Sequence, residues 1–178
     1  KSQEYLAGLV EELCKLPKET TWVEFKENVA NPEEIGEYLS ALSNAAALSG
    51  KANAYLIWGI RDGTHEVVGT NFQPGQTKKG NEDLENWLLR LLNPRLHFRF
   101  YAFDFKEKPL VLLEIPRATG KQTLCSGTEF IRTGSYKQKL KDHHQPDRQL
   151  RSIFETTPFE ELQGMARVES AQVPSDSD

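Results

Sequence analysis

The stretch Ala54-Tyr55-Leu56-Ile57-Trp58-Gly59-Ile60 is apolar along nearly its whole length. A run this short, bounded by polar residues, is typical of a strand that is covered on both faces. The next residues, Arg61 to Thr64, have the composition of a tight turn, and Glu66 to Gly69 leads back as a short second arm. We therefore predict a central strand over 54–60 with a β-hairpin at its end.

Helical periodicity surrounds this strand. Leu6, Val10 and Leu13 recur at helical spacing, and the pair Asn31-Pro32 has the composition of a helix start, with a capping side chain followed by proline. On this basis we predict four helices, at residues 3–15, 32–50, about 82–92 with Glu82 and Asp83 in the first turn, and 147–155.

Strand-forming residues occupy most of the remaining chain. Residues 22–26 alternate between apolar and charged, which predicts a half-buried strand. Residues 97–105 and 110–115 predict a second hairpin, with a bulge near 101–103 where the alternation slips. Two shorter strands are predicted near 123–125 and 129–132. Helices and hairpins in this order predict an α+β domain, with a mixed, mainly antiparallel sheet and helices packed on it.

Composition excludes several classes of protein. The chain has 178 residues, of which 38% are hydrophobic and 27% charged, the balance of a folded soluble domain. No apolar run approaches the roughly 20 residues of a membrane-spanning helix. Two cysteines, Cys14 and Cys125, are too few for a disulfide framework, so we expect a cytoplasmic protein. The chain begins without methionine and ends in a polar stretch, so we expect a domain at 1–162, followed at 163–178 by a tail or linker to a further part.

Positive charge is concentrated in one segment. Residues 121–151 hold 7 Lys and Arg against 3 Asp and Glu, whereas residues 1–120 hold 14 against 17. Such a segment is able to contact nucleic-acid phosphates, and the alternative is a solvated surface loop. We expect the phosphate contacts from five side chains: Arg132, Ser135, Lys137, Lys139 and Lys141.

The sequence lacks the glycine-rich phosphate-binding motifs of nucleotide-dependent enzymes, and it lacks nucleophile elbows and paired-cysteine zinc motifs. Carboxylates are the remaining candidates for catalysis. Glu24 and Lys26 project from one face of a strand, Glu19 lies just before it, and Asp62 follows the central strand. Carboxylates suit Mg²⁺ or Mn²⁺, and the lysine would steady charge on a phosphate. The alternative is a solvated strand edge.

Three groups of residues together resemble the Schlafen family, in its Alba-like domain. They are the motif Glu19-x4-Glu24-Phe25-Lys26, the helix with Glu34-Ile35 and Ala41-Leu42-Ser43-Asn44, and the run from Tyr55 to Gly63 followed by Val68-Gly69. Residues 130–135 are similar to a late R-x-G-S element, and residues 154–160 resemble the closing segment of the family. The resemblance covers roughly residues 12–162.

The resemblance implies two functions. Bacterial domains of this family resemble N-terminal DNA-binding modules of transcriptional regulators. Animal Schlafens that cleave transfer and ribosomal RNA use three acidic residues, and Glu19, Glu24 and Asp62 occupy the corresponding positions. We therefore expect a nucleic-acid-binding module, with DNA or RNA as partner. The alternatives are a metal-dependent endoribonuclease and a protein-interaction or small-ligand sensor domain. A homodimer would join two basic segments into one groove.

Overall fold

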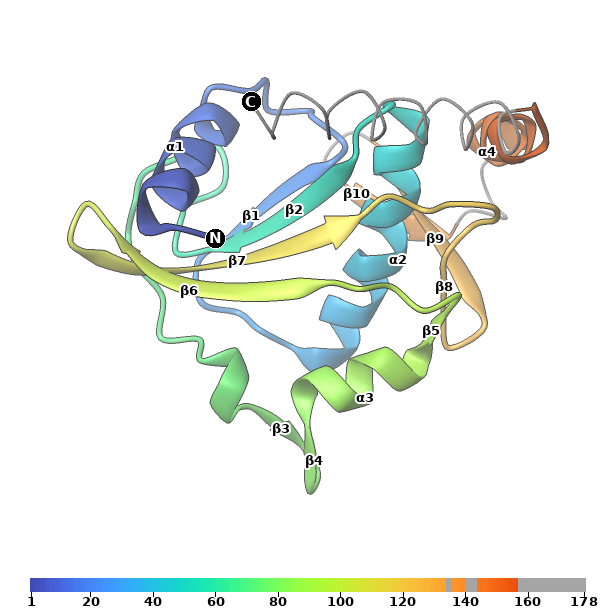
Figure 1. Ribbon diagram of the computed structural model, residues 1–178. Helices are drawn as coiled ribbons and strands as arrows, with labels where there is room; N and C mark the ends of the chain where they lie inside the picture. Colours follow the sequence, from blue (N-terminus) through green and yellow to red (C-terminus); the bar gives the residue numbers. More distant parts are fainter. Residues whose placement is uncertain (134–135, 140–143, 157–178) are drawn as a thin grey trace, which may run out of the picture.

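The described part of the computed structural model, residues 1–133, 136–139 and 144–156, contains one large sheet, a smaller second sheet and four helices (Figure 1). The helices are α1 (Gln3–Cys14), α2 (Pro32–Leu48), α3 (Leu84–Leu91) and α4 (His144–Thr156). The large sheet has the order β1-β2-β7-β6, with β1 (Val23–Lys26), β2 (Asn53–Trp58), β6 (Arg99–Phe105) and β7 (Lys108–Pro116). The predicted α+β class with a mixed, mainly antiparallel sheet is confirmed, since only β1 and β2 pair in parallel within these strands.

Strand β2 is central, as its apolar sequence predicts. Leu56 and Trp58 pack into the core beneath α2, whereas Tyr55 and Ile57 pack into the core beneath α1. Alternate residues therefore bury both faces of the strand. Strand β2 ends at Trp58 because Gly59 adopts a φ of +104°, where a side chain would also collide with Leu110.

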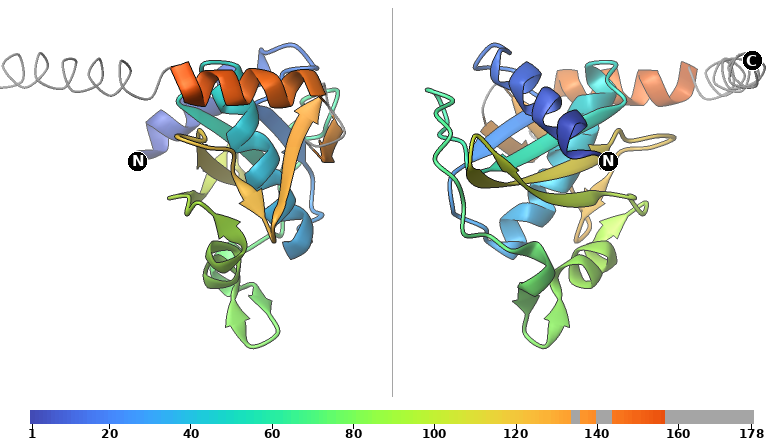
Figure 2. Two further views of the ribbon diagram at one scale, coloured as in Figure 1. Left: turned by 90° about the vertical axis from the view of Figure 1, so that its right-hand side faces the viewer. Right: turned by 60° about the vertical axis from the view of Figure 1, so that its left-hand side comes forward.

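Helix α2 lies between the large sheet and a second sheet of short strands (Figures 1 and 2). The second sheet has the order β10-β9-β8-β5, with β5 (Leu92–Asn93), β8 (Leu124–Cys125), β9 (Thr128–Thr133) and β10 (Tyr136–Lys139). A two-stranded sheet of β3 (Lys78–Lys79) and β4 (Glu82–Asp83) follows the short 3-10 helix η1 (Pro74–Gln76). Because α2 is covered on both sides, most of its length is buried.

Two sequence expectations for strands need correction. The hairpin of β6 and β7 has an unbroken register from Arg99 opposite Glu114 to Phe105 opposite Lys108, so the predicted bulge near 101–103 is absent from it. The arm after the central strand forms only one bridge, between Ile60 and Val67. Strands β3, β4, β5 and β10 were not predicted, and each is only two to four residues long. Glu82 and Asp83, expected in the first turn of a helix, form β4 instead, and α3 begins at Leu84.

Helix α4 covers the end of α2 through an apolar stripe. Leu150 is fully buried against Ala47, Ala118 and Ile131, and Phe154 packs against the same cluster. Among the described residues, none of the helices combines the length and the apolar character needed to cross a membrane. The proposed tail at 163–178 lies outside the described residues.

Candidate nucleic-acid interface

Strand β1 presents its charged residues toward α2. Val23 and Phe25 pack beneath α1, so the alternating Glu24 and Lys26 point to the opposite face. Glu24 is only 5% exposed, although it is a carboxylate. A carboxylate buried this deeply needs a charged partner, which comes from the second sheet.

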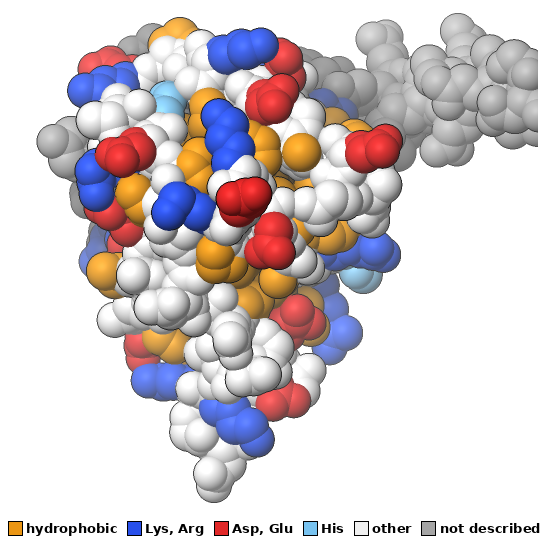
Figure 3. All heavy atoms as spheres, turned by 90° about the vertical axis from the view of Figure 1, so that its left-hand side faces the viewer, with side chains coloured by type: hydrophobic (Ala, Val, Ile, Leu, Met, Phe, Trp, Pro, Cys, Tyr) orange, Lys and Arg blue, Asp and Glu red, His pale blue; other side chains and the backbone are white. Residues whose placement is uncertain are grey.

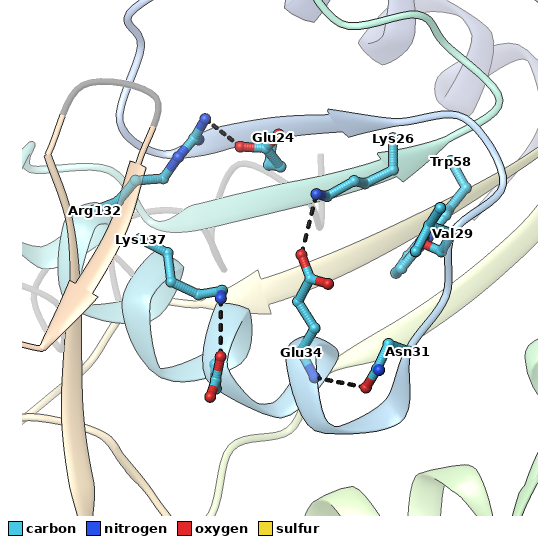
Figure 4. Close-up of polar contacts among 9 residues, drawn as sticks. Glu24, Lys26, Val29, Asn31, Glu34, Trp58, Arg132 and Lys137 are labelled. Carbon is cyan, nitrogen blue, oxygen red and sulfur yellow. Dashed lines mark hydrogen bonds and ion pairs between the residues drawn. The ribbon is translucent and has the colours of Figure 1, made fainter.

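Arg132 of β9 is that partner (Figure 4). Its guanidinium forms an ion pair with Glu24, and the two side chains are 3% and 6% exposed. The same guanidinium donates hydrogen bonds to the backbone oxygens of Val23 and, at 3.4 Å, of Thr20. Burial raises the pKa of Glu24 and lowers that of Arg132, while the attraction between the two charges opposes both shifts. The pair ties the second sheet to the outer edge of β1.

Two lysines lie over one aromatic ring beside this pair. Lys26 Nζ and Lys137 Nζ are each 5.1 Å from the centroid of the Tyr38 ring. Glu34 Oε1 accepts from Lys26 at 3.1 Å, and Glu37 Oε1 accepts from Lys137 at 2.8 Å. All three of these α2 residues lie on one helix face, because they are spaced by three and four positions.

The ionisation states of Lys26 and Tyr38 follow from their burial and from the charged groups around them. Burial lowers the pKa of Lys26, but the interactions with Tyr38 and Glu34 outweigh it, so the pKa is raised overall and the ammonium stays charged. Burial, together with the charge of Glu24, raises the pKa of Tyr38, so its phenol stays protonated. The site therefore holds the Lys26 ammonium and a neutral phenol, beside the carboxylates of Glu34 and Glu37 that accept from the two lysines.

A small pocket of about 170 Å³, including its open mouth, adjoins Lys26. Trp58 forms one wall and is fixed there, because its indole nitrogen donates to the Val29 oxygen at 3.0 Å. Asn31 caps α2 at the rim by accepting from the amides of Glu33 and Glu34. The pocket connects the N-terminal end of α2 to the face of β1 that bears Lys26 (Figure 4).

The three predicted catalytic carboxylates lie in different environments. Glu24 is buried with Arg132, whereas Glu19 and Asp62 are exposed. Among the described residues, no group of three or more His, Cys, Asp and Glu is arranged to hold a metal ion. The carboxylates therefore do not fit the predicted Mg²⁺ or Mn²⁺ site, because a guanidinium already occupies the cation position beside Glu24.

The residues predicted to contact phosphates also differ in their exposure to solvent. Arg132 is not on the surface, contrary to expectation, because its charge is buried against Glu24. Lys137 is half-buried beside Tyr38, and Lys139 is exposed on β10. Ser135 and Lys141 lie outside the described residues.

Sequence reasoning missed Tyr38, Glu34 and Glu37 as site residues. Their helical spacing next to the Asn31-Pro32 start is visible in the sequence, but nothing there shows which strands face this side of α2. Lys26 and Lys137 are 111 positions apart, so no local pattern in the sequence shows that both approach Tyr38.

Exposed cations remain in the loop before β8, on β10 and on α4. Lys121, Lys139 and Arg148 are exposed, and none of them forms an ion pair with another residue of the described ranges. By contrast, acidic and basic side chains are interspersed over the face that bears α1, without a continuous basic patch on its described part (Figure 3). Lys18, Lys106 and Lys108, on other parts of the described surface, are likewise exposed and form no ion pair with another described residue.

The fold and these contacts define an α+β domain with an internal ion pair between its two sheets. The chain belongs to the Schlafen AlbA_2 family, whose model matches residues 19–141. A segment of 96 residues, 52% of the chain, is 31% identical to the uncharacterized ATP-binding protein UU034 of Ureaplasma parvum serovar 3. The chain spans about a quarter of the length of that relative, since the match covers 25% of it.

Two solved structures are similar to the fold. The DIP2311 protein from Corynebacterium diphtheriae has a TM-score of 0.52 and 16% identity, over 77% of this chain and 26% of that one. The N-terminal domain of an ATP-dependent DNA helicase RecG-related protein from Nitrosomonas europaea has a TM-score of 0.43 and 20% identity, over 63% of this chain and 72% of that one. The first of these similarities supports the fold alone.

Proposed function

We propose that this domain binds nucleic acid mainly through phosphate contacts from the second sheet and α4. The observation that carries the proposal is the set of exposed, unbalanced cations at Lys121, Lys139 and Arg148. Membership in the Schlafen AlbA_2 family supports it. Contacts to phosphates fix position on the nucleic acid but carry little sequence information, so binding is weakly specific and sensitive to salt.

At a finer level, we propose the N-terminal DNA-binding role in a bacterial transcriptional regulator. This role requires a further part beyond the domain, and a homodimer would present two basic surfaces to one duplex. Light scattering coupled to size exclusion, with and without DNA, distinguishes a dimer from a monomer.

The proposal is tested by removing the three cations together. A Lys121→Ala, Lys139→Ala, Arg148→Ala variant is compared with a control that loses three exposed lysines elsewhere, Lys15, Lys106 and Lys108. Fluorescence anisotropy with unrelated DNA and RNA oligonucleotides should show weaker binding and a shallower salt dependence for the first variant only. Equal affinity of the first variant and the parent at low salt contradicts the proposal.

The metal-dependent endoribonuclease stays a prediction from the family resemblance. The pairing of Glu24 with Arg132 does not support it, because the carboxylate is already neutralised. The protein-interaction or small-ligand sensor also stays a prediction, and the pocket beside Lys26 is its most suitable place.

A further inference from the structure

We propose that Lys26 and Lys137 form a clamp that holds one backbone phosphate beside the ring of Tyr38. This inference rests on the proposed nucleic-acid binding and assigns a second contact point to it. The two lysines come from different sheets, and neither belongs to the exposed set at Lys121, Lys139 and Arg148.

The distances suit a phosphate. Each ammonium nitrogen is 5.1 Å from the same ring centroid, so the two nitrogens are no farther apart than twice that distance. A phosphate that accepts a charge-assisted hydrogen bond of about 2.8 Å from each ammonium through two of its oxygens spans about 8 Å, so the clamp requires the two nitrogens to lie within that distance of each other. The side chains of Lys26 and Lys137 are 26% and 21% exposed, so a ligand can reach both.

The buried ion pair sets the spacing between the lysines. Lys26 lies two residues after Glu24 on the same face of β1. Lys137 lies directly opposite Arg132 in the register of β9 and β10. Because Glu24 and Arg132 are fixed to each other, their neighbours Lys26 and Lys137 are brought to the same ring.

The carboxylates of α2 hold Lys26 and Lys137 in place through the two ion pairs. Glu34 and Glu37 are 33% and 36% exposed, and partly exposed ion pairs of this kind contribute little to stability. A phosphate can therefore take over the ammonium hydrogen bonds from these carboxylates. Glu24, Arg132 and the exposed Asp62 also contribute charges of both signs near this site. The clamp therefore binds a phosphate by exchanging the carboxylate partners of the lysines for phosphate oxygens, not by attracting it from a distance.

The test compares Lys26→Ala and Lys137→Ala with Lys51→Ala. Lys51 is a matched control because its ammonium also lies over an aromatic ring, 5.0 Å from the centroid of Trp22. Binding of a single-stranded oligonucleotide is measured across a salt series. Each clamp variant should bind several-fold more weakly, with a salt slope reduced by about one, whereas the control keeps the parent slope. Lys26→Arg and Lys137→Arg should restore the slope, because they keep the charge, and thermal melts establish that each variant is folded.

The outcomes separate this inference from the proposed function. Parent slopes in folded Lys26→Ala and Lys137→Ala, together with a reduced slope in the Lys121, Lys139 and Arg148 variant, overturn the clamp and leave nucleic-acid binding standing. No binding by the parent at low salt overturns both.

Discussion

Asn44 and Thr123 are joined by two reciprocal hydrogen bonds across 79 residues of sequence. Asn44 Nδ2 donates to the Thr123 oxygen at 3.1 Å, and the Thr123 amide donates to Asn44 Oδ1 at 2.9 Å. Asn44 Nδ2 also donates to the Phe130 oxygen at 2.8 Å. Both residues have 0% exposure, so this amide fastens the strands of the second sheet to α2 in a place that water does not reach.

Replacement of Asn44 by Ala should destabilise the domain by about 2 to 4 kcal/mol, because it leaves buried backbone groups of Thr123 and Phe130 without that partner. Urea unfolding followed by circular dichroism measures the change. Asn86→Ala, at an exposed position of α3, is the control and should change stability by less than about 0.5 kcal/mol. If both variants lost the same unfolding free energy, the Asn44 hydrogen bonds would contribute no more to stability than an exposed side chain.

The buried pair of Glu24 and Arg132 predicts strong coupling between two substitutions. Glu24→Leu should cost about 3 to 5 kcal/mol of unfolding free energy, because it leaves a buried guanidinium without its counter-charge. A double variant, Glu24→Leu with Arg132→Met, removes both charges and should recover much of that loss. A double-mutant cycle from chemical denaturation measures the coupling, and additive losses would rule out a coupled pair.

Helix α1 precedes the residues that match the family model, yet it covers one face of the large sheet. Leu13 is 2% exposed in that core, so Leu13→Ala should cost about 2 to 5 kcal/mol. Gly8→Ala in the same helix should instead stabilise by about 1 kcal/mol, since a methyl group there meets nothing within 4 Å. Thermal melts of both variants decide the matter, and a neutral Leu13→Ala would mean that α1 adds no stability.

Transfer RNA incubated with the domain and Mn²⁺ or Mg²⁺ should stay intact, because Arg132 neutralises Glu24. Gel analysis of the RNA measures this. Asp62→Asn and Glu19→Gln are better controls than Glu24→Gln, since both side chains are exposed and their replacement leaves the core intact. Metal-dependent cleavage by the parent that disappears in Asp62→Asn would contradict the expectation and favour the endoribonuclease.

Regular elements could be predicted from the sequence because their signals are local. The apolar run of β2, the Asn31-Pro32 start of α2 and the periodicity of α1 each lie within a few turns or one strand. Two strands of the second sheet, β5 and β10, carry little signal of their own. Strand β10 forms by pairing with β9. Its own sequence, Tyr136 to Lys139, shows no alternation of apolar and polar residues from which a strand could be predicted.

The candidate site could be predicted only in part, because it depends on contacts between distant segments. The charge count placed Arg132 with the surface cations, yet it follows the buried residues Phe130 and Ile131 and pairs with a residue 108 positions earlier. Lys139 stands on the surface, as a basic segment predicts. Tyr38 was invisible as a site residue, since its importance comes from two lysines that approach it from different sheets.

The hydrogen bond from Arg132 to the Val23 oxygen has a consequence for synthesis on the ribosome. Val23 and Arg132 are separated by 109 residues, so the outer edge of β1 is translated long before the side chain that covers it. An uncovered strand edge is a template for pairing with other chains. Nascent chains that have not yet reached residue 132 therefore carry an edge that other chains can pair with, until Arg132 is added and covers it.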